Sequence, residues 1–123
     1  MIRQIEPEPK YSITSTFMKG GRIMYENLLP IGSVVLLKGA KTKLMIMGRI
    51  LSDEKLEEIY DYVGCIYPLG MTGDDNNYFF NRDGIEKVFF VGFQDEEELN
   101  FRSEVLAELG ELEIKDGEIV PKE

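Results

Sequence analysis

The feature that most constrains this chain is a set of predicted strands that are apolar on both faces. Side chains alternate between the two faces of a strand. In the last predicted strand, Phe89, Val91 and Phe93 fall on one face. Val88 and Phe90 fall on the other. A solvated antiparallel sheet alternates apolar with polar residues instead. Both faces of this sheet therefore need a cover, either from the rest of the chain or from another molecule.

Five strands are predicted from runs of β-branched and aromatic residues bounded by turn formers. They span residues 33–38, 43–51, 60–67, 78–80 and 86–93. The first two are joined by a short polar connection and form a hairpin. Gly48, inside the second strand, indicates a bulge or a close backbone approach. Residues 52–59 form either a helical turn or a polar loop.

One long helix is predicted after the last strand. Asp95 can cap its first turn, and Glu98 stands at the third helical position, as in a capping box. One apolar stripe runs along it: Leu99, Phe101, Val105, Leu106 and Leu109. Such a stripe predicts a buried face. We therefore expect the helix to dock on the sheet with Phe101, Val105 and Leu109 pointing inward.

These elements predict an α+β fold. The sheet is a curved five-stranded antiparallel sheet or a small SH3-like barrel, with one C-terminal helix. A chain of 123 residues has room for one core. We expect residues 1–25 to form a loosely attached N-terminal arm, because prolines and a glycine pair interrupt them. Residues 26–110 are the single domain. Residues 111–123 are a short hairpin or tail, in which Asp116-Gly117 is typical of a type I′ turn.

The predicted helix covers only part of a five-stranded sheet, because about fifteen helical residues make a rod roughly 22 Å long. Two outcomes stay open. Either the arm and the C-terminal hairpin complete the cover, or apolar surface remains for a second chain. In the second case we expect the surface on the sheet face away from the helix, or along an unpaired edge. Aromatic residues suit such contacts. The candidate partner-binding residues are Tyr60, Tyr62 and Tyr67, together with Phe79 or Phe80, whichever turns outward.

The residue types argue against catalysis. The chain has no histidine, which removes the commonest general base and the usual zinc ligand. Its single cysteine, Cys65, forms no intrachain disulfide and no CxxC metal site. Its glycines match no phosphate-binding motif. We therefore expect a protein that is not an enzyme, with no catalytic residues, no cofactor and no metal site.

The net charge of −9 is unevenly distributed. Residues 1–51 hold eight basic and three acidic side chains, whereas residues 52–123 hold six basic and twenty acidic ones. Such asymmetry favours an oriented partner contact. The overall negative charge argues against nucleic-acid binding. A small RNA-binding barrel stays open as an alternative. Its basic patch would be Lys38, Lys41, Lys43 and Arg49.

The apolar runs of the chain are short. None approaches the ~20 residues that span a bilayer. Residues 1–10 carry charges and two prolines and lack the apolar centre of a signal peptide. We therefore expect a cytoplasmic protein with no membrane insertion, for which one free cysteine is acceptable.

Four motifs in this order resemble a known family. They are ENLLPIGSVVLLKG with KLMIMGR (26–39 and 43–49), YDYVGCIYP (60–68), NYFFN (77–81) and GFQDEEE (92–98). Together they are similar to the small family called domain of unknown function 4176. The likeness covers about residues 26–102.

The resemblance implies a protein of Gram-positive bacteria, encoded near type VII secretion components and toxins with an LXG domain. It implies a cytosolic, non-enzymatic adaptor or chaperone that binds an exported protein partner, such as an LXG toxin or another type VII substrate. No catalytic residues come with the family. An immunity protein that binds the folded toxin domain, through the acidic half of the chain, is the alternative. Self-association into a homo-oligomer also stays open.

Overall fold

The computed structural model describes residues 18–19, 22–53, 55, 57–73 and 76–122. In chain order the elements are β1 (Met18–Lys19), β2 (Arg22–Ile23), the 3-10 helix η3 (Tyr25–Asn27), β3 (Val34–Leu37), β4 (Leu44–Ser52), β5 (Ile59–Ile66), β6 (Tyr78–Phe80), η5 (Arg82–Gly84), β7 (Ile85–Phe90), α2 (Glu96–Glu104), η6 (Leu106–Glu108), β8 (Leu112–Lys115) and β9 (Glu118–Pro121).

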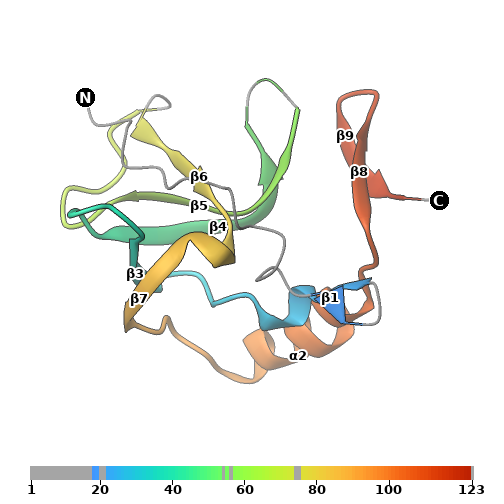
Figure 1. Cartoon of the computed structure of the whole chain (residues 1–123). Coiled ribbons are helices and arrows are strands. Elements are labelled where there is room, and N and C mark those ends of the chain that lie inside the picture. The colour runs from blue at the N-terminus through green and yellow to red at the C-terminus, as the bar shows by residue number, and fades with distance from the viewer. Residues whose placement is uncertain (1–17, 20–21, 54, 56, 74–75, 123) are drawn as a thin grey trace.

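An open antiparallel sheet of five strands forms the body of the protein (Figure 1). Its strand order is β6-β5-β4-β3-β7. Strands β3 to β6 are neighbours in chain order, and β7 crosses back to pair with the far side of β3. Within the described residues β6 and β7 do not pair with each other, so the sheet does not close into a barrel. The predicted α+β class, with its five-stranded sheet and one C-terminal helix, is confirmed.

Strand β4 bends where the sequence predicted a bulge. Its register against β5 shifts between Ile46 and Gly48. A Cβ atom on Gly48 would lie 2.8 Å from Cγ1 of Val63, so the Val63 side chain occupies the space beside this glycine. Ile50, two residues on, has a φ of 55°. A bulge increases the local twist, and Figure 1 shows β3 and β7 crossing the direction of β4 and β5. The inner face of the curled sheet encloses the core.

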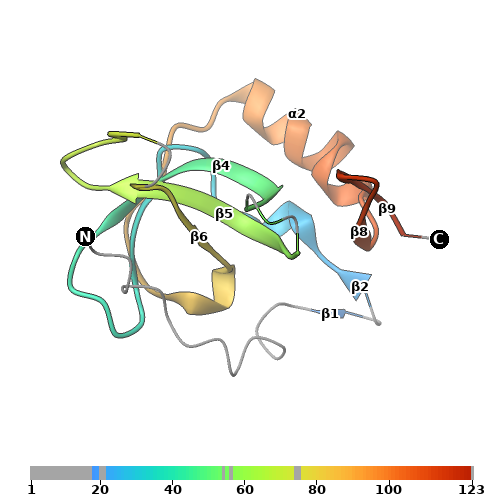
Figure 2. The same ribbon diagram turned by 90° about the horizontal axis from the view of Figure 1, so that it is seen from above.

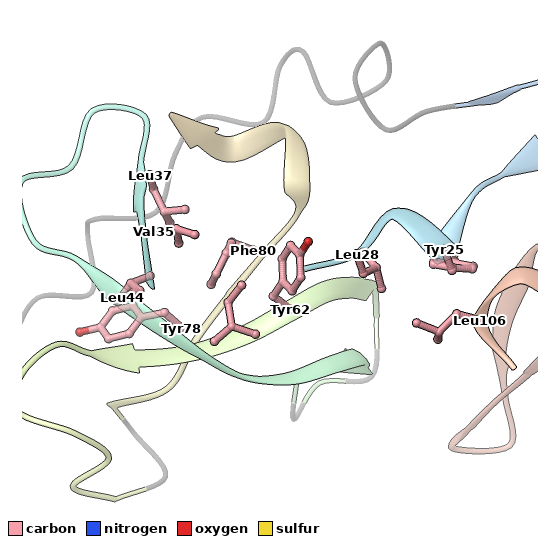
Figure 3. Close-up of a cluster of buried hydrophobic side chains, with 10 residues drawn as sticks. Tyr25, Leu28, Val35, Leu37, Leu44, Tyr62, Tyr78, Phe80 and Leu106 are labelled. Carbon is pink, nitrogen blue, oxygen red and sulfur yellow. The ribbon is translucent and has the colours of Figure 1, made fainter. Parts of the chain in front are cut away.

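The core is the set of side chains on that inner face together with three from outside the sheet (Figure 3). It comprises Tyr25, Leu28, Val35, Leu37, Leu44, Ile46, Tyr62, Tyr78, Phe80 and Leu106. Tyr62 lies at its centre, where its hydroxyl accepts a hydrogen bond of 2.8 Å from the backbone N–H of Leu29. Burial raises the pKa of Tyr62 to about 12, so this hydroxyl stays protonated.

A buried ion pair joins β5 to η5, and its arginine also contacts the chain before β3. Asp61 is 6% exposed and accepts hydrogen bonds from the backbone N–H and Nε of Arg82, at 2.8 and 2.9 Å. The same guanidinium donates to the carbonyl of Met24 and lies over the ring of Tyr25, 5.8 Å from its centroid. Because each charge has several partners, the cluster offsets the cost of burying it.

Helix α2 is shorter than predicted and does not dock as predicted. Its cap is confirmed, because Asp95 Oδ1 accepts a hydrogen bond from the Glu98 N–H. However, Phe101 is 42% exposed and Val105 43%, so their expected inward orientation is wrong, whereas Leu109 is partly buried against the core. Figure 2 shows the helix beside the end of the sheet rather than over one of its faces, and it packs on η3. The chain leaves the α-helix after residue 104, and of the stripe only Leu106 is fully buried.

The C-terminal residues form the hairpin that the sequence predicted. Strands β8 and β9 pair through a turn with φ of 52° at Asp116 and 79° at Gly117, the left-handed values of a type I′ turn. The hairpin stands apart from the five-stranded sheet (Figure 1), with Leu112 packed against the core. The predicted domain boundaries stay predictions, since residues 1–17 of the predicted arm lie outside the described residues. Tyr25, placed in that arm, is a core residue.

Candidate protein-binding surface

The aromatic residues predicted to bind a partner are divided between the core and the surface. Tyr62 is 1% exposed, so its expected exposure is wrong, and Phe80, at 2%, is the member of its pair that turns inward. They are a cross-strand pair on the inner face, with ring centroids 5.3 Å apart, and the curl of the sheet encloses both. Phe79 is the one of its pair that turns outward; it is half-buried beside Tyr60, which is also half-buried. Tyr67 is 46% exposed.

A group of exposed apolar side chains lies instead along the end of β7, one of the two edge strands of the sheet, and in the segments beside it. Their exposed fractions lie between 42% and 78%. We call them the β7 surface: Ile31, Val88, Phe89, Phe90, Val91 and Phe93. Among the strands that the structure describes, none pairs with the outer side of β7. An unpaired edge is one of the two places where the sequence predicted such a surface.

The β7 surface is exposed because of its register and because the helix lies elsewhere. Val34 pairs with Phe90 and Val35 with Val88, so Phe89 is the extra residue of a bulge. Bulges are common at sheet edges, where they direct side chains outward. The partners on β3 lie within the sheet, and Val35 is fully buried. From Val88 to Phe90 on β7, and at Val91 just after it, every side chain remains at least 42% exposed.

Two hydrogen bonds of the buried Ser33 hydroxyl fix the end of the β7 surface. Ser33 is fully buried; its Oγ accepts a 2.9 Å hydrogen bond from the Gly92 N–H and donates a 2.8 Å bond to the Pro30 carbonyl. A Cβ atom on Gly92 would lie 2.1 Å from the carbonyl oxygen of Ile31, so only glycine fits. The exposed strand end is therefore held against the turn before β3.

Two lysines border the β7 surface. The ammonium nitrogens of Lys43 and Lys87 lie 4.6 and 4.9 Å from the ring centroid of Phe89. Lys43 also lies 5.9 Å from the ring of Tyr67, which brings one predicted residue to this surface. Among the described residues no carboxylate forms an ion pair with either lysine. The surface thus combines exposed rings with two available positive charges.

The loop after β5 also exposes apolar side chains. Leu69 is 64% exposed and Met71 59%. Both follow Tyr67, which contacts Lys43 as described above.

Arg49, the fourth residue of the predicted basic patch, lies elsewhere. It forms a bidentate ion pair with Glu98, at 2.8 and 3.0 Å, and donates to the carbonyl of Leu29. Its guanidinium lies 5.4 Å from the ring centroid of Phe101. The hydrogen bonds from Arg49 hold the pKa of the Glu98 carboxyl below its ordinary value. Arg49 therefore attaches helix α2 to the sheet and is not part of a basic surface.

An open groove of about 420 Å³ lies between the start of β5 and β8. It is lined by Tyr25, Glu57, Glu58, Ile59, Leu112, Glu113 and Ile114. In the part of the chain that the structure describes, no three His, Cys, Asp or Glu residues are grouped to hold a metal ion. No described helix has the length and apolar character needed to cross a membrane.

The sequence shows apolar residues on both faces of the last predicted strand, but these residues were not among the predicted partner-binding residues. The sequence could have indicated this surface, since Phe89, Phe90 and Phe93 stand close together in a chain with one predicted long helix to cover the sheet. What was missing was the strand order, which puts β7 at the edge.

The fold and this surface define a small α+β protein whose outer strand exposes apolar side chains on both faces. The chain belongs to the family described as a domain of unknown function, DUF4176, whose family model matches residues 28–101. That match runs from the residues before β3 into α2, so the β7 surface lies inside the family domain. No curated protein and no solved structure matches the chain.

Proposed function

We propose that this chain is a non-enzymatic accessory factor that binds a partner protein through the β7 surface. The observation that carries the proposal is a group of six large apolar side chains, each 42% to 78% exposed, of which three lie on the edge strand β7 and three in the segments beside it. Together they expose roughly 500 Å² of apolar surface. That is at the upper end of what a monomer exposes, and such patches mark interaction sites.

The partner we propose follows the family resemblance. It is a type VII secretion substrate such as an LXG toxin, which the chain binds in the cytoplasm as an adaptor or chaperone before export. A fixed apolar edge suits this role, because it can shield apolar segments that a partner exposes before it folds or assembles.

An immunity protein is the second candidate function. The acidic rim of the groove between β5 and β8, with Glu57, Glu58 and Glu113, supports it. The RNA-binding alternative loses support, since Arg49 is paired with Glu98 and three lysines remain of its patch.

Co-expression tests the proposal. The tagged chain is expressed with the LXG domain of a toxin, and separately with the toxin's catalytic domain. We expect capture of the LXG domain, and Phe90→Asp should lower that capture at least about tenfold by placing a charge in the contact. Leu99→Asp is the matched control, because Leu99 is 52% exposed on α2, outside the β7 surface.

Two results contradict the proposal. Capture of the LXG domain that is equal for the native chain and Phe90→Asp excludes the β7 surface as the contact. Capture of the catalytic domain alone, lost in a Glu57→Lys and Glu58→Lys double variant, points to the immunity protein instead. Circular dichroism of each variant confirms that it is folded.

A further inference from the structure

We infer that the β7 surface accepts an extended segment of the partner protein as a sixth strand of the sheet, and that this segment is apolar on both faces and places a carboxylate beside Lys43 and Lys87. This inference rests on the proposed function and specifies which kind of partner segment the β7 surface binds. It is drawn from the exposure of both faces of β7 and from the charges at Phe89.

The exposure of both faces selects a strand over a helix. Val88 pairs with Val35 and Phe90 pairs with Val34, and the side chains of Val34 and Val35 point to opposite faces, yet Val88 and Phe90 both remain exposed. A helix offers one apolar stripe and would lie on one face only. A strand added to the edge hydrogen-bonds to the backbone of β7 and brings side chains to both faces. It therefore covers the whole surface.

The charges at the surface select an acidic segment. Two ammonium groups lie within 5 Å of the centroid of one ring, Phe89, and neither forms an ion pair with a described carboxylate. A carboxylate placed beside them meets two positive charges in a site that the partner shields from water, where such bonds are strongest. A lysine at the same position would be repelled.

The same charges disfavour a second copy of this chain as the occupant. Pairing β7 with another β7 would bring two copies each of Lys43 and Lys87 to one sheet edge, against two copies of Glu86, the acidic residue of β7. Like charges on neighbouring strands are destabilising. A partner with carboxylates avoids this repulsion.

The edge is also prepared for a strand. The hydrogen bonds of Ser33 hold Gly92, just beyond the end of β7, in place. Since the β7 edge is already ordered, only the incoming segment loses conformational freedom on binding. The bound stretch matches the length of β7, Ile85–Phe90.

Synthetic peptides test the inference. Four probes share the same valine, isoleucine and phenylalanine residues: a strand-forming peptide with two glutamates on one face, its lysine counterpart, the glutamate peptide with prolines at alternate positions, and a helix-forming arrangement of the glutamate peptide. Each is titrated to about 1 mM into the full ¹⁵N-labelled chain. Amide chemical shifts and hydrogen exchange report the site of binding.

We expect the acidic strand peptide to shift and protect the amides of β7, and to bind at least about tenfold more tightly than the lysine peptide. The proline peptide should fail, because it cannot donate to the edge. In a Lys43→Glu and Lys87→Glu double variant the preference should reverse. Lys41→Glu is the matched control, since Lys41 is exposed on the same connection and contacts neither ring.

Four results overturn the inference. They are no binding of the acidic strand peptide, equal binding of the lysine peptide, preferential binding of the helical peptide, and a dimer in sedimentation that Phe90→Asp dissociates. If capture of the LXG domain still depends on Phe90 in these cases, the proposed function stands and only the binding mode is wrong. If peptide binding follows the expectation but no LXG domain is captured, the proposed partner is wrong instead.

Discussion

The aromatic residues of β5 and β6 resemble those of β7 in sequence but have the opposite exposure. Tyr62 and Phe80 are 1% and 2% exposed, whereas Phe89 and Phe90 are 43% and 60% exposed. The first pair lies where the sheet curls around its own inner face and belongs to the core. The second pair lies on β7, which is an edge strand like β6, and neither of its rings belongs to the core. Alternation along a strand thus assigns a residue to a face, and the curvature of the sheet decides whether that face is covered.

The comparison also separates two kinds of contribution. The enclosed pair determines stability, because its side chains leave water on folding. The exposed pair contributes little to folding, and this leaves it free to bind a partner. The predictions below test this separation.

The largest expected effect is the truncation of the enclosed pair. Phe80→Ala should lower the free energy of unfolding by about 3–5 kcal/mol, the usual loss for a buried aromatic residue. Phe90→Ala should change it by about 0.5 kcal/mol or less. Urea denaturation of both variants measures the difference. Equal losses would mean that β7 is as much a part of the core as β6.

A smaller change at the centre of the core tests the hydrogen bond alone. Tyr62→Phe keeps the ring but leaves the N–H of Leu29 without its acceptor, so we expect a loss of about 1–3 kcal/mol. Tyr67→Phe, at an exposed position, is the control and should be close to neutral. A neutral Tyr62→Phe would show that this N–H finds another partner.

Gly92→Ala tests the close packing at the end of the β7 surface. The new Cβ would lie 2.1 Å from the Ile31 carbonyl oxygen, so the backbone must move, at a cost of about 1–3 kcal/mol. Gly110→Ala is the control, because nothing lies within 4 Å of its Cβ position. Thermal unfolding of the two variants checks this. Similar melting temperatures would contradict the close packing of Gly92 against the turn before β3.

The attachment of α2 should depend on pH. The pKa of Glu98 in the folded protein is below its ordinary value of 4.5, because Arg49 hydrogen-bonds to the carboxylate. Its stabilisation is therefore complete above the ordinary pKa and is lost as the pH falls through the lowered one. Glu98→Gln should cost about 1–2 kcal/mol at pH 7 and less at low pH. Urea denaturation from pH 7 to pH 3 measures it, and a constant difference would contradict the ion pair.

The smallest expected effect on folding is at the most exposed ring. Phe93 is 78% exposed, so Phe93→Ser should change the free energy of unfolding by about 0.5 kcal/mol or less. Capture of the LXG domain should nevertheless fall. A stability loss as large as that of Phe80→Ala would place Phe93 in the folded core and remove it from the binding surface.

Local patterns in the sequence determined most of the elements. The turn at Asp116-Gly117, the cap at Asp95 and the bulge at Gly48 each follow from the conformational preference of a few neighbouring residues, and the structure contains all three. The five strands follow from short runs of β-branched and aromatic residues in the same way. Their apolar residues on both faces also indicated that some surface would lack a cover.

Only the tertiary structure decided which surface that is. Arg49 and Glu98 are 49 positions apart, and their ion pair holds α2 at the end of the sheet, so Phe101 does not dock on a face. The pairing of β7 with β3 is equally distant in sequence and puts Phe89 and Phe90 at the edge. Periodicity records the direction of each side chain from its own backbone. What lies opposite that side chain depends on contacts between distant segments, which no local pattern contains.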